Sequence, residues 1–403
     1  MNTDIKKEND SYFIFEKKKD TNADIKKIRT EILPRFFASS NLNFLIGTGC
    51  SIYAGAKSFS GEMPYYKEIL IDEIEKNLKD KLTSLLKEEK RNPEIVLNEL
   101  YEIQQSLSTL QIDTTKIVKV VKDFKEKYIK HHVLDIIYNL SDEKNAHNTF
   151  LTKLTSRDAK LGRPNIFTLN YDLLFEMAGD SLGIYVNNGF HGLQNRFFNP
   201  SNYDVDIFIK SGSQSQKASN SVNLYKLHGS LSWSKATNSE SPFNLYDIFE
   251  KQLDIETSGK VAYEKIKDDF IIYPESRKTK NSLDVPYNEL FRRFIEAMHQ
   301  PSAVLFVLGY GFGDDHVNKM ITNAFRNPDF HLLVFMFSED MQNDYYSRLK
   351  ALSNQDSRIS IFVGEEIADF INFSNHVLPF YDKQQDVINQ LKGVIKELSK
   401  DVK

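Results

Sequence analysis

The sequence has very little cysteine, no long apolar run and no strong excess of either charge. Cys50 is the single cysteine among 403 residues, which excludes an internal disulfide and a four-cysteine zinc ribbon. Basic and acidic residues number 52 and 56, and a net charge of −4 gives no general attraction for nucleic acid or an anionic membrane. No run reaches the roughly 20 apolar residues of a membrane helix, and the first thirty residues are too polar for a signal peptide. We therefore expect a cytoplasmic protein that binds neither membrane nor nucleic acid directly.

The sequence does contain a series of short apolar runs, separated by helical or loop segments. Several of these runs are continuously apolar, which is typical of parallel strands that helices cover on both faces. The predicted fold class is therefore α/β, a doubly wound Rossmann-like parallel sheet without a zinc module. Strands are expected at 11–15, 44–46, 165–170, 183–188, 222–229, 270–274, 303–309, 331–337 and 358–363.

A long helical pattern interrupts this series of strands. Between residues 63 and 140 apolar side chains recur every three or four positions, which predicts an inserted helical subdomain. Within it, Asn92 followed by Pro93 is typical of a helix start. Two polar segments, 210–221 and 235–242, are expected to be surface loops. The chain is thus expected to comprise an arm at 1–30, the α/β domain at 31–62 and 141–380, the helical subdomain at 63–140 and a C-terminal helix at 381–403.

The segment NFLIGTGCSIYAG, residues 43–55, changes abruptly from a strand to glycines and small residues. Gly47 and Gly49 would let backbone N–H groups approach a phosphate, and a following helix would present its positive end. A structural turn explains the pattern equally well, because the spacing is not that of the dinucleotide fingerprint. Cys50 has no basic neighbour in the sequence to activate it, so a buried packing role is favoured over a nucleophile.

Two further polar elements follow predicted strands, where ligands bind in open α/β sheets. In TLNYD, residues 168–172, the amide of Asn170 could hold a ribose hydroxyl or a water, and Asp172 could accept from hydroxyls, although either could simply cap a helix. In KLHGS, residues 226–230, His228 could accept a proton near neutral pH, although a lone histidine is more often structural.

The last element is LGYGFGDDHVNKMI, residues 308–321, a second junction of strand, glycines and helix. Its glycines could admit an adenosine against bare backbone, and Asp314 or Asp315 could bind a sugar hydroxyl or cap the helix. None of the histidines has a metal-like spacing to carboxylates or to Cys50, so no metal is proposed.

The ordered set GTGCS, TLNYD, LHGS and LGYGFGDDH resembles the sirtuin (silent-information-regulator-like) family. The similarity is to its divergent bacterial form, found in anti-phage defence proteins that destroy NAD⁺, and it covers residues from about 35 to about 340. The resemblance implies NAD⁺ as the substrate, with Asn170 and His228 as the catalytic residues. The residues that it implies for NAD⁺ binding are Gly47, Thr48, Gly49, Cys50, Ser51, Asp172, Gly309, Tyr310, Gly311 and Gly313.

Two departures from protein-deacylating sirtuins bear on the activity. Those enzymes usually carry a four-cysteine zinc module and a glutamine before the motif asparagine, where this chain has one cysteine and Leu169. The resemblance thus favours hydrolysis of NAD⁺ to ADP-ribose and nicotinamide. NAD⁺-dependent deacylation and a non-enzymatic module that senses NAD⁺ or ADP-ribose are the alternatives.

The resemblance also implies a biological role and a mode of control. The expected role is that of a toxic effector in anti-phage defence, which causes abortive infection by depleting NAD⁺. Because such an effector needs an inactive state, we expect a homo-oligomer or a partner such as a HerA-type DNA translocase ATPase.

Overall fold

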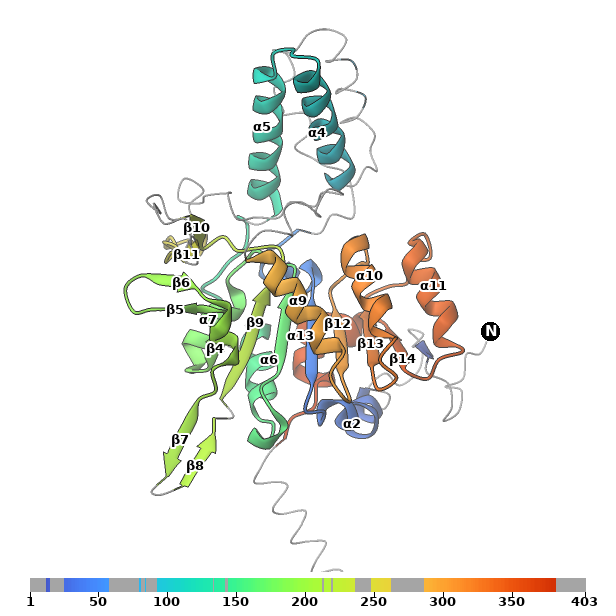
Figure 1. Ribbon diagram of the computed structural model, residues 1–403. Coiled ribbons are helices and arrows are strands. Elements are labelled where there is room, and N and C mark those ends of the chain that lie inside the picture. The colour runs from blue at the N-terminus through green and yellow to red at the C-terminus, as the bar shows by residue number, and fades with distance from the viewer. Residues whose placement is uncertain are drawn as a thin grey trace, which may run out of the picture.

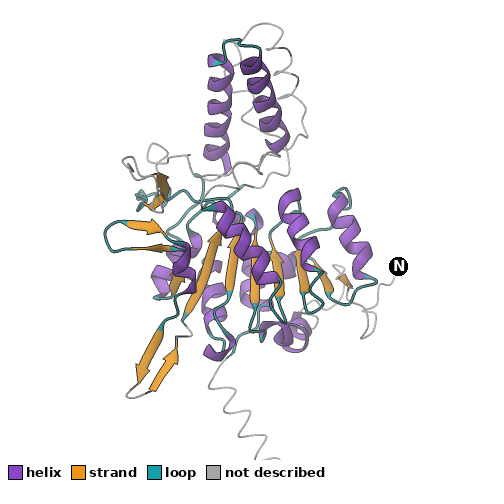
Figure 2. Ribbon diagram, in the orientation of Figure 1, coloured by secondary structure: helices purple, strands orange, loops and turns teal. Residues whose placement is uncertain are grey.

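An eight-stranded, all-parallel sheet forms the centre of the computed structural model (Figures 1 and 2). The structure describes residues 12–14, 25–57, 80, 84, 93–132, 134–141, 144–211, 214–218, 220–235, 248–261 and 286–381. In spatial order the strands are β1 (Tyr12–Ile14), β14 (Ile359–Val363), β13 (His331–Met336), β12 (Val304–Leu308), β2 (Leu42–Ile46), β3 (Asn165–Thr168), β9 (Ser221–Lys226) and β4 (Tyr185–Asn187).

Both faces of this sheet are buried, which explains why its strands are apolar at successive positions. Along β2 and β12, Leu45 and Val307 contribute to one hydrophobic cluster, whereas Phe44 and Phe306 contribute to the cluster on the opposite face. Successive side chains of a strand point to opposite faces, so one strand feeds both clusters. The predicted doubly wound α/β class is confirmed.

Helices form a layer on each face (Figure 1). The front layer contains α9 (Tyr287–Met298), α10 (Asp315–Ala324) and α11 (Asp344–Ser353). The rear layer contains η1 (Ile28–Ile32), α2 (Leu33–Phe37), α6 (Ala146–Thr155), α7 (Leu174–Leu182), α12 (Glu365–Ala368), α13 (Phe370–Asn372) and η9 (Phe373–Val377). None of the described helices is long and apolar enough to cross a bilayer.

Two small sheets lie outside the central one. The order β10 (Trp233–Lys235), β11 (Ile248–Glu250), β6 (Arg196–Phe198), β5 (Phe190–His191) forms an antiparallel sheet that the sequence did not predict. A hairpin of β7 (Phe208–Ser211) and β8 (Gln214–Lys217) takes up half of 210–221, so the surface loop predicted there is wrong for those residues. Short 3₁₀ segments are η5 (Ala159–Leu161) and η6 (Pro200–Asp204). The predicted strand at 270–274, most of 235–242 and nearly all of the predicted C-terminal helix lie outside the described residues.

A helical hairpin stands above one edge of the central sheet (Figure 1). It consists of α4 (Pro93–Thr109), which begins at the predicted proline, and α5 (Thr115–His132). Their apolar faces form a third hydrophobic cluster that includes Leu100 and Phe124. The same cluster contains Ala54, at the end of the 3₁₀ segment after β2, and Leu173 and Leu231, which follow β3 and β9. The hairpin and the loops that the sequence singled out therefore contribute to one hydrophobic cluster.

Candidate functional site

The sheet has a topological switch point between β2 and β12. From this point β3 and β9 follow β2 on one side, whereas β13 and β14 follow β12 on the other, which is the order of a Rossmann fold. In such sheets ligands bind in the crevice outside the carboxyl ends of the strands at the switch point. Gly47 follows β2 and Gly309 follows β12, so both glycine loops lie there.

These two glycine loops pack directly on one another. The N–H of Gly47 donates to the carbonyl of Leu308 over 2.9 Å, and the N–H of Gly49 donates to the carbonyl of Gly309 over 2.9 Å. A Cβ added at Gly47 would lie 2.4 Å from the Gly309 carbonyl oxygen. Gly309 itself has φ +61°, and a Cβ there would lie 2.5 Å from the backbone nitrogen of Cys50. Contact between loops therefore requires glycine at these positions, apart from any ligand.

The other two glycines of the second loop are different. A Cβ added at Gly311 or Gly313 would meet nothing within 4 Å, and neither residue has a left-handed φ. Neither packing nor backbone conformation thus demands glycine there. Open space beside bare backbone is what close approach of a ligand would require.

The segment after β2 is not the α-helix that the sequence analysis expected. Thr48–Ala54 is a seven-residue 3₁₀ segment, η2, so no α-helix presents its positive end at Gly47. Cys50 is buried there, and burial, followed by the charge of Asp172, raises the pKa of its thiol. The thiol is therefore neutral and inert, as the packing interpretation requires.

Asn170 lies at the centre of a buried hydrogen-bond network. Its Nδ2 donates to the carbonyl of Gly47 over 3.1 Å and to Oγ of Ser51 over 2.9 Å. Its backbone N–H donates to Oγ1 of Thr168 over 3.0 Å. With the amide nitrogen fixed in this way, Oδ1 is buried and has no hydrogen-bond partner. An acceptor oxygen in that state is available to a ligand hydroxyl or a water.

Asp172 supports this network from the other side. Its Oδ2 accepts from Oγ of Ser51 over 2.8 Å, and its Oδ1 accepts from the N–H of Leu174 over 3.1 Å. Both oxygens are thus engaged within the protein and the side chain is buried. The geometry gives Asp172 a role in holding Ser51 and the start of α7.

His228 lies beside this network because β3 and β9 are neighbouring parallel strands. The N–H of Leu227 donates to the carbonyl of Thr168 over 2.9 Å, and the N–H of Leu231 donates to the carbonyl of Tyr171 over 3.1 Å. The two loops therefore run side by side, and the Tyr171 and His228 ring centroids are 6.5 Å apart. The fold brings the amide and the imidazole to adjacent strand ends.

The second glycine loop places the carboxylate of Asp314 beside His228. Nε2 of His228 lies 3.2 Å from Oδ2 of Asp314, and both side chains are more than 90% buried. Asp314 also caps α10, as one of the sequence interpretations expected, because its Oδ1 accepts from the N–H of His316 and of Val317. The hydroxyl of Tyr310 lies within hydrogen-bond distance of Oδ1 of Asn318 and of the Asp314 backbone, so Tyr310 braces this loop from inside.

A buried lysine, which sequence reasoning missed, holds the loop that carries Asn170. Nζ of Lys226 donates to the carbonyls of Tyr171 and Asp172 and to Oε1 of Glu176, the last over 3.1 Å. Lys226 is 2% exposed. Burial raises the pKa of Glu176, and the charge of Lys226 opposes that rise. The signal for this role was a lysine inside the apolar run VNLYKLHG.

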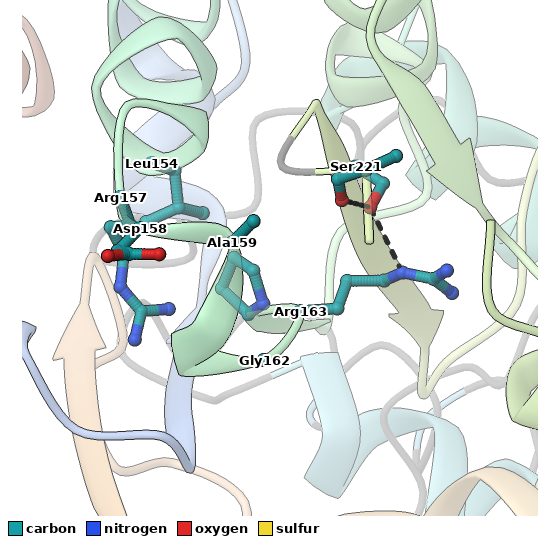
Figure 3. Close-up of a pocket in the computed structure, with 9 residues that line it drawn as sticks. Leu154, Arg157, Asp158, Ala159, Gly162, Arg163 and Ser221 are labelled. Carbon is teal, nitrogen blue, oxygen red and sulfur yellow. Dashed lines mark hydrogen bonds between the residues drawn. The ribbon is translucent and has the colours of Figure 1, made fainter. Parts of the chain in front are cut away.

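A small cavity lies at the opposite edge of the sheet, near the amino ends of β3 and β9 (Figure 3). Leu154, Arg157, Arg163 and Ser221 are among its lining residues, and Nε of Arg163 donates to Oγ of Ser221 over 3.2 Å. Its volume of about 10 Å³ is room for one water at most. This cavity is far too small for a dinucleotide.

The described residues contain no group of three or more His, Cys, Asp or Glu side chains that could hold a metal ion.

No protein of curated function matches the chain. Residues 164–360 match the family model described as the SIR2-like domain, a range that contains Asn170, His228 and the second glycine loop. This match supports a place in the sirtuin-like family and an NAD⁺-related enzymatic function.

Proposed function

We propose that the protein is an NAD⁺ glycohydrolase that releases nicotinamide and ADP-ribose. The observation that carries this proposal is the convergence of Asn170 and His228 at adjacent strand ends, beside the switch point of a SIR2-like domain. The catalytic unit would comprise 31–62 and 141–380, with 63–140 as the helical insertion and 1–30 and 381–403 as terminal extensions.

In the proposed reaction a water oxygen attacks the anomeric carbon of the nicotinamide ribose. The glycosidic C–N bond breaks with its electron pair going to the ring nitrogen, so the pyridinium leaves as neutral nicotinamide and needs no acid. Oδ1 of Asn170 would orient the ribose or the water, since it is buried and has no hydrogen-bond partner. His228 would accept the proton that the water loses, directly or through a ribose hydroxyl.

The binding residues in this proposal come from both glycine loops. Gly47, Thr48, Gly49, Cys50 and Ser51 would line the phosphates on one side, with Asp172 behind them. On the other side the backbone of Gly309, Tyr310, Gly311 and Gly313 would face the adenosine. The open backbone at Gly311 and Gly313 supports this assignment, because the fold gives no other reason for glycine there.

Hydrolysis is favoured over deacylation because the chain itself packs against one side of the site loops. Deacylation needs a groove for an acyl-lysine peptide in addition to NAD⁺, whereas hydrolysis needs only water. Leu173 and Leu231, one on each site loop, are buried in the cluster that includes the α4–α5 hairpin. This side of the loops is therefore occupied by the chain itself.

The test is chromatography of products after incubation of purified protein with NAD⁺. Asn170→Ala and His228→Ala should each lower the rate by at least about 10²-fold, while both variants remain folded. Asn354→Ala and His376→Ala, at exposed positions, are the matched controls and should turn over NAD⁺ normally. Near wild-type turnover in either site variant would refute the assignment.

A further inference from the structure

We propose that Asp314 is a positioning residue that orients the imidazole of His228, an inference that rests on the proposed function. The two residues are 86 positions apart in the sequence, yet Nε2 and Oδ2 lie 3.2 Å apart in a buried setting. Charged and polar groups interact strongly where water is excluded. Asp314 is thus close enough to fix which way the ring faces.

The carboxylate of Asp314 is itself held rigidly. Its Oδ1 accepts from the N–H of His316 over 2.9 Å and from the N–H of Val317 over 3.3 Å, at the first turn of α10. Its backbone N–H donates to the hydroxyl of Tyr310 over 3.2 Å. Rotation of the carboxylate would break the helix cap, so Oδ2 is a fixed point for the histidine.

This contact selects the tautomer of His228. A carboxylate beside one ring nitrogen favours the proton on that nitrogen and leaves the other as the acceptor. The contact is at Nε2, so Nδ1 is the unprotonated nitrogen of the favoured tautomer. In the hydrolysis step Nδ1 would take the proton from water, and the imidazolium that forms would be stabilised by the charge of Asp314.

Two substitutions separate this role from helix capping. Asparagine, serine and aspartate are equally good caps, so Asp314→Asn and Asp314→Ser should both preserve α10. Asparagine keeps the shape but loses the charge, and serine is too short to reach the ring. We expect kcat to fall at least about tenfold in Asp314→Asn and further in Asp314→Ser, with KM changed less than about twofold.

The control is the same pair of substitutions at Asp158, an exposed residue that caps η5 by accepting from the N–H of Lys160. Asp158→Asn and Asp158→Ser should leave kcat unchanged. Wild-type kcat in both Asp314 variants would overturn the positioning role.

A measurement without turnover distinguishes this inference from the proposed function. In ¹⁵N-histidine-labelled protein at pH 8 without NAD⁺, the His228 signal, assigned with His228→Asn, should show Nε2 protonated and Nδ1 unprotonated. In Asp314→Ser the two tautomers should mix. A wild-type ring protonated on Nδ1 would overturn the inference even if the enzyme is active. The expected tautomer in a protein that never cleaves NAD⁺ would refute only the proposed function.

Discussion

At the scale of single residues, the site depends on buried polar side chains that hold one another. Asn170 and Ser51 hold the first glycine loop, Lys226 holds the Asn170 loop, and Asp314 faces His228. Each contact joins segments far apart in the sequence. Such groups are costly to bury alone, so removal of one partner should cost more than the bond itself.

Lys226→Met should lower the free energy of unfolding by about 3 kcal/mol, because it leaves Glu176 buried and two carbonyls without a donor. Lys226→Met with Glu176→Gln should regain part of that loss, since no buried charge is left unpaired. Urea unfolding of the wild type and the variants measures both effects. Equal stability of the wild type and Lys226→Met would show that the lysine does not support the loop.

The raised pKa of Glu250 should make the stability of the protein depend on pH. Burial raises the pKa of Glu250 to about 7, against an opposing contribution from the charge of Arg196. A carboxyl whose pKa is higher in the folded state binds its proton more tightly there. Its contribution to stability is therefore complete at a pH below its pKa in the unfolded chain, and is lost as the pH rises through the folded pKa of about 7.

Between pH 5 and pH 8 the free energy of unfolding should fall by about 2 kcal/mol less in Glu250→Gln than in the wild type. The difference would be read from urea unfolding at both pH values. Glu365→Gln, at an exposed position, should follow the wild type at both. If stability depends on pH in Glu250→Gln as it does in the wild type, Glu250 is not the group responsible.

At the scale of elements, the glycine loops contain glycines that packing requires and others that only a ligand would require. Gly309→Ala places a Cβ against the Cys50 backbone at a left-handed φ, so it should lower the free energy of unfolding by at least about 2 kcal/mol. Gly311→Ala meets open space and should leave stability within about 0.5 kcal/mol of the wild type.

The same pair of variants tests the binding role of the second loop. If Gly311 faces the nucleotide, Gly311→Ala should raise KM for NAD⁺ while the melting temperature stays constant. Calorimetry and steady-state kinetics on the same preparations give both quantities. An unchanged KM would leave Gly311 outside the binding site.

The central strands could be predicted from the sequence, whereas the peripheral sheet could not. Strands buried on both faces are apolar at successive positions, so β2, β3, β9, β12, β13 and β14 stood out as runs. Strands of two or three residues, such as Phe190–His191, carry too little pattern to be recognised. The hairpin at 208–217 is polar along most of its length, which is why it was expected to be a loop.

Sequence reasoning located the loops of the candidate site but not their contacts. It placed Asn170, His228 and the glycines after strands, and the parallel sheet then put them at one edge. It could not show that Gly47 and Gly309 are required by contact between their loops, because those residues are 262 positions apart. The pairing of His228 with Asp314 was hidden for the same reason.

At the scale of the whole molecule, an NAD⁺ hydrolase that is always active would kill its host. We propose that assembly controls the activity, as a homo-oligomer or with a partner such as a HerA-type ATPase, and that the biological role is NAD⁺ depletion in anti-phage defence. Binding of another subunit or a partner to the α4–α5 hairpin could alter the site loops, because the hairpin shares a hydrophobic cluster with Leu173 and Leu231.

Analytical ultracentrifugation together with activity assays tests this control. The wild type should sediment as an oligomer, and its specific activity should change with protein concentration or with added partner. A strict monomer with full activity at every concentration would contradict control by assembly.

The most direct test of the central claim is nicotinamide release in H₂¹⁸O, with and without an acetyl-lysine peptide. Water attack predicts equal rates in both mixtures and one ¹⁸O at the anomeric position of the ADP-ribose, read by mass spectrometry before the label exchanges. Nicotinamide release that requires the peptide would contradict NAD⁺ hydrolysis by this protein.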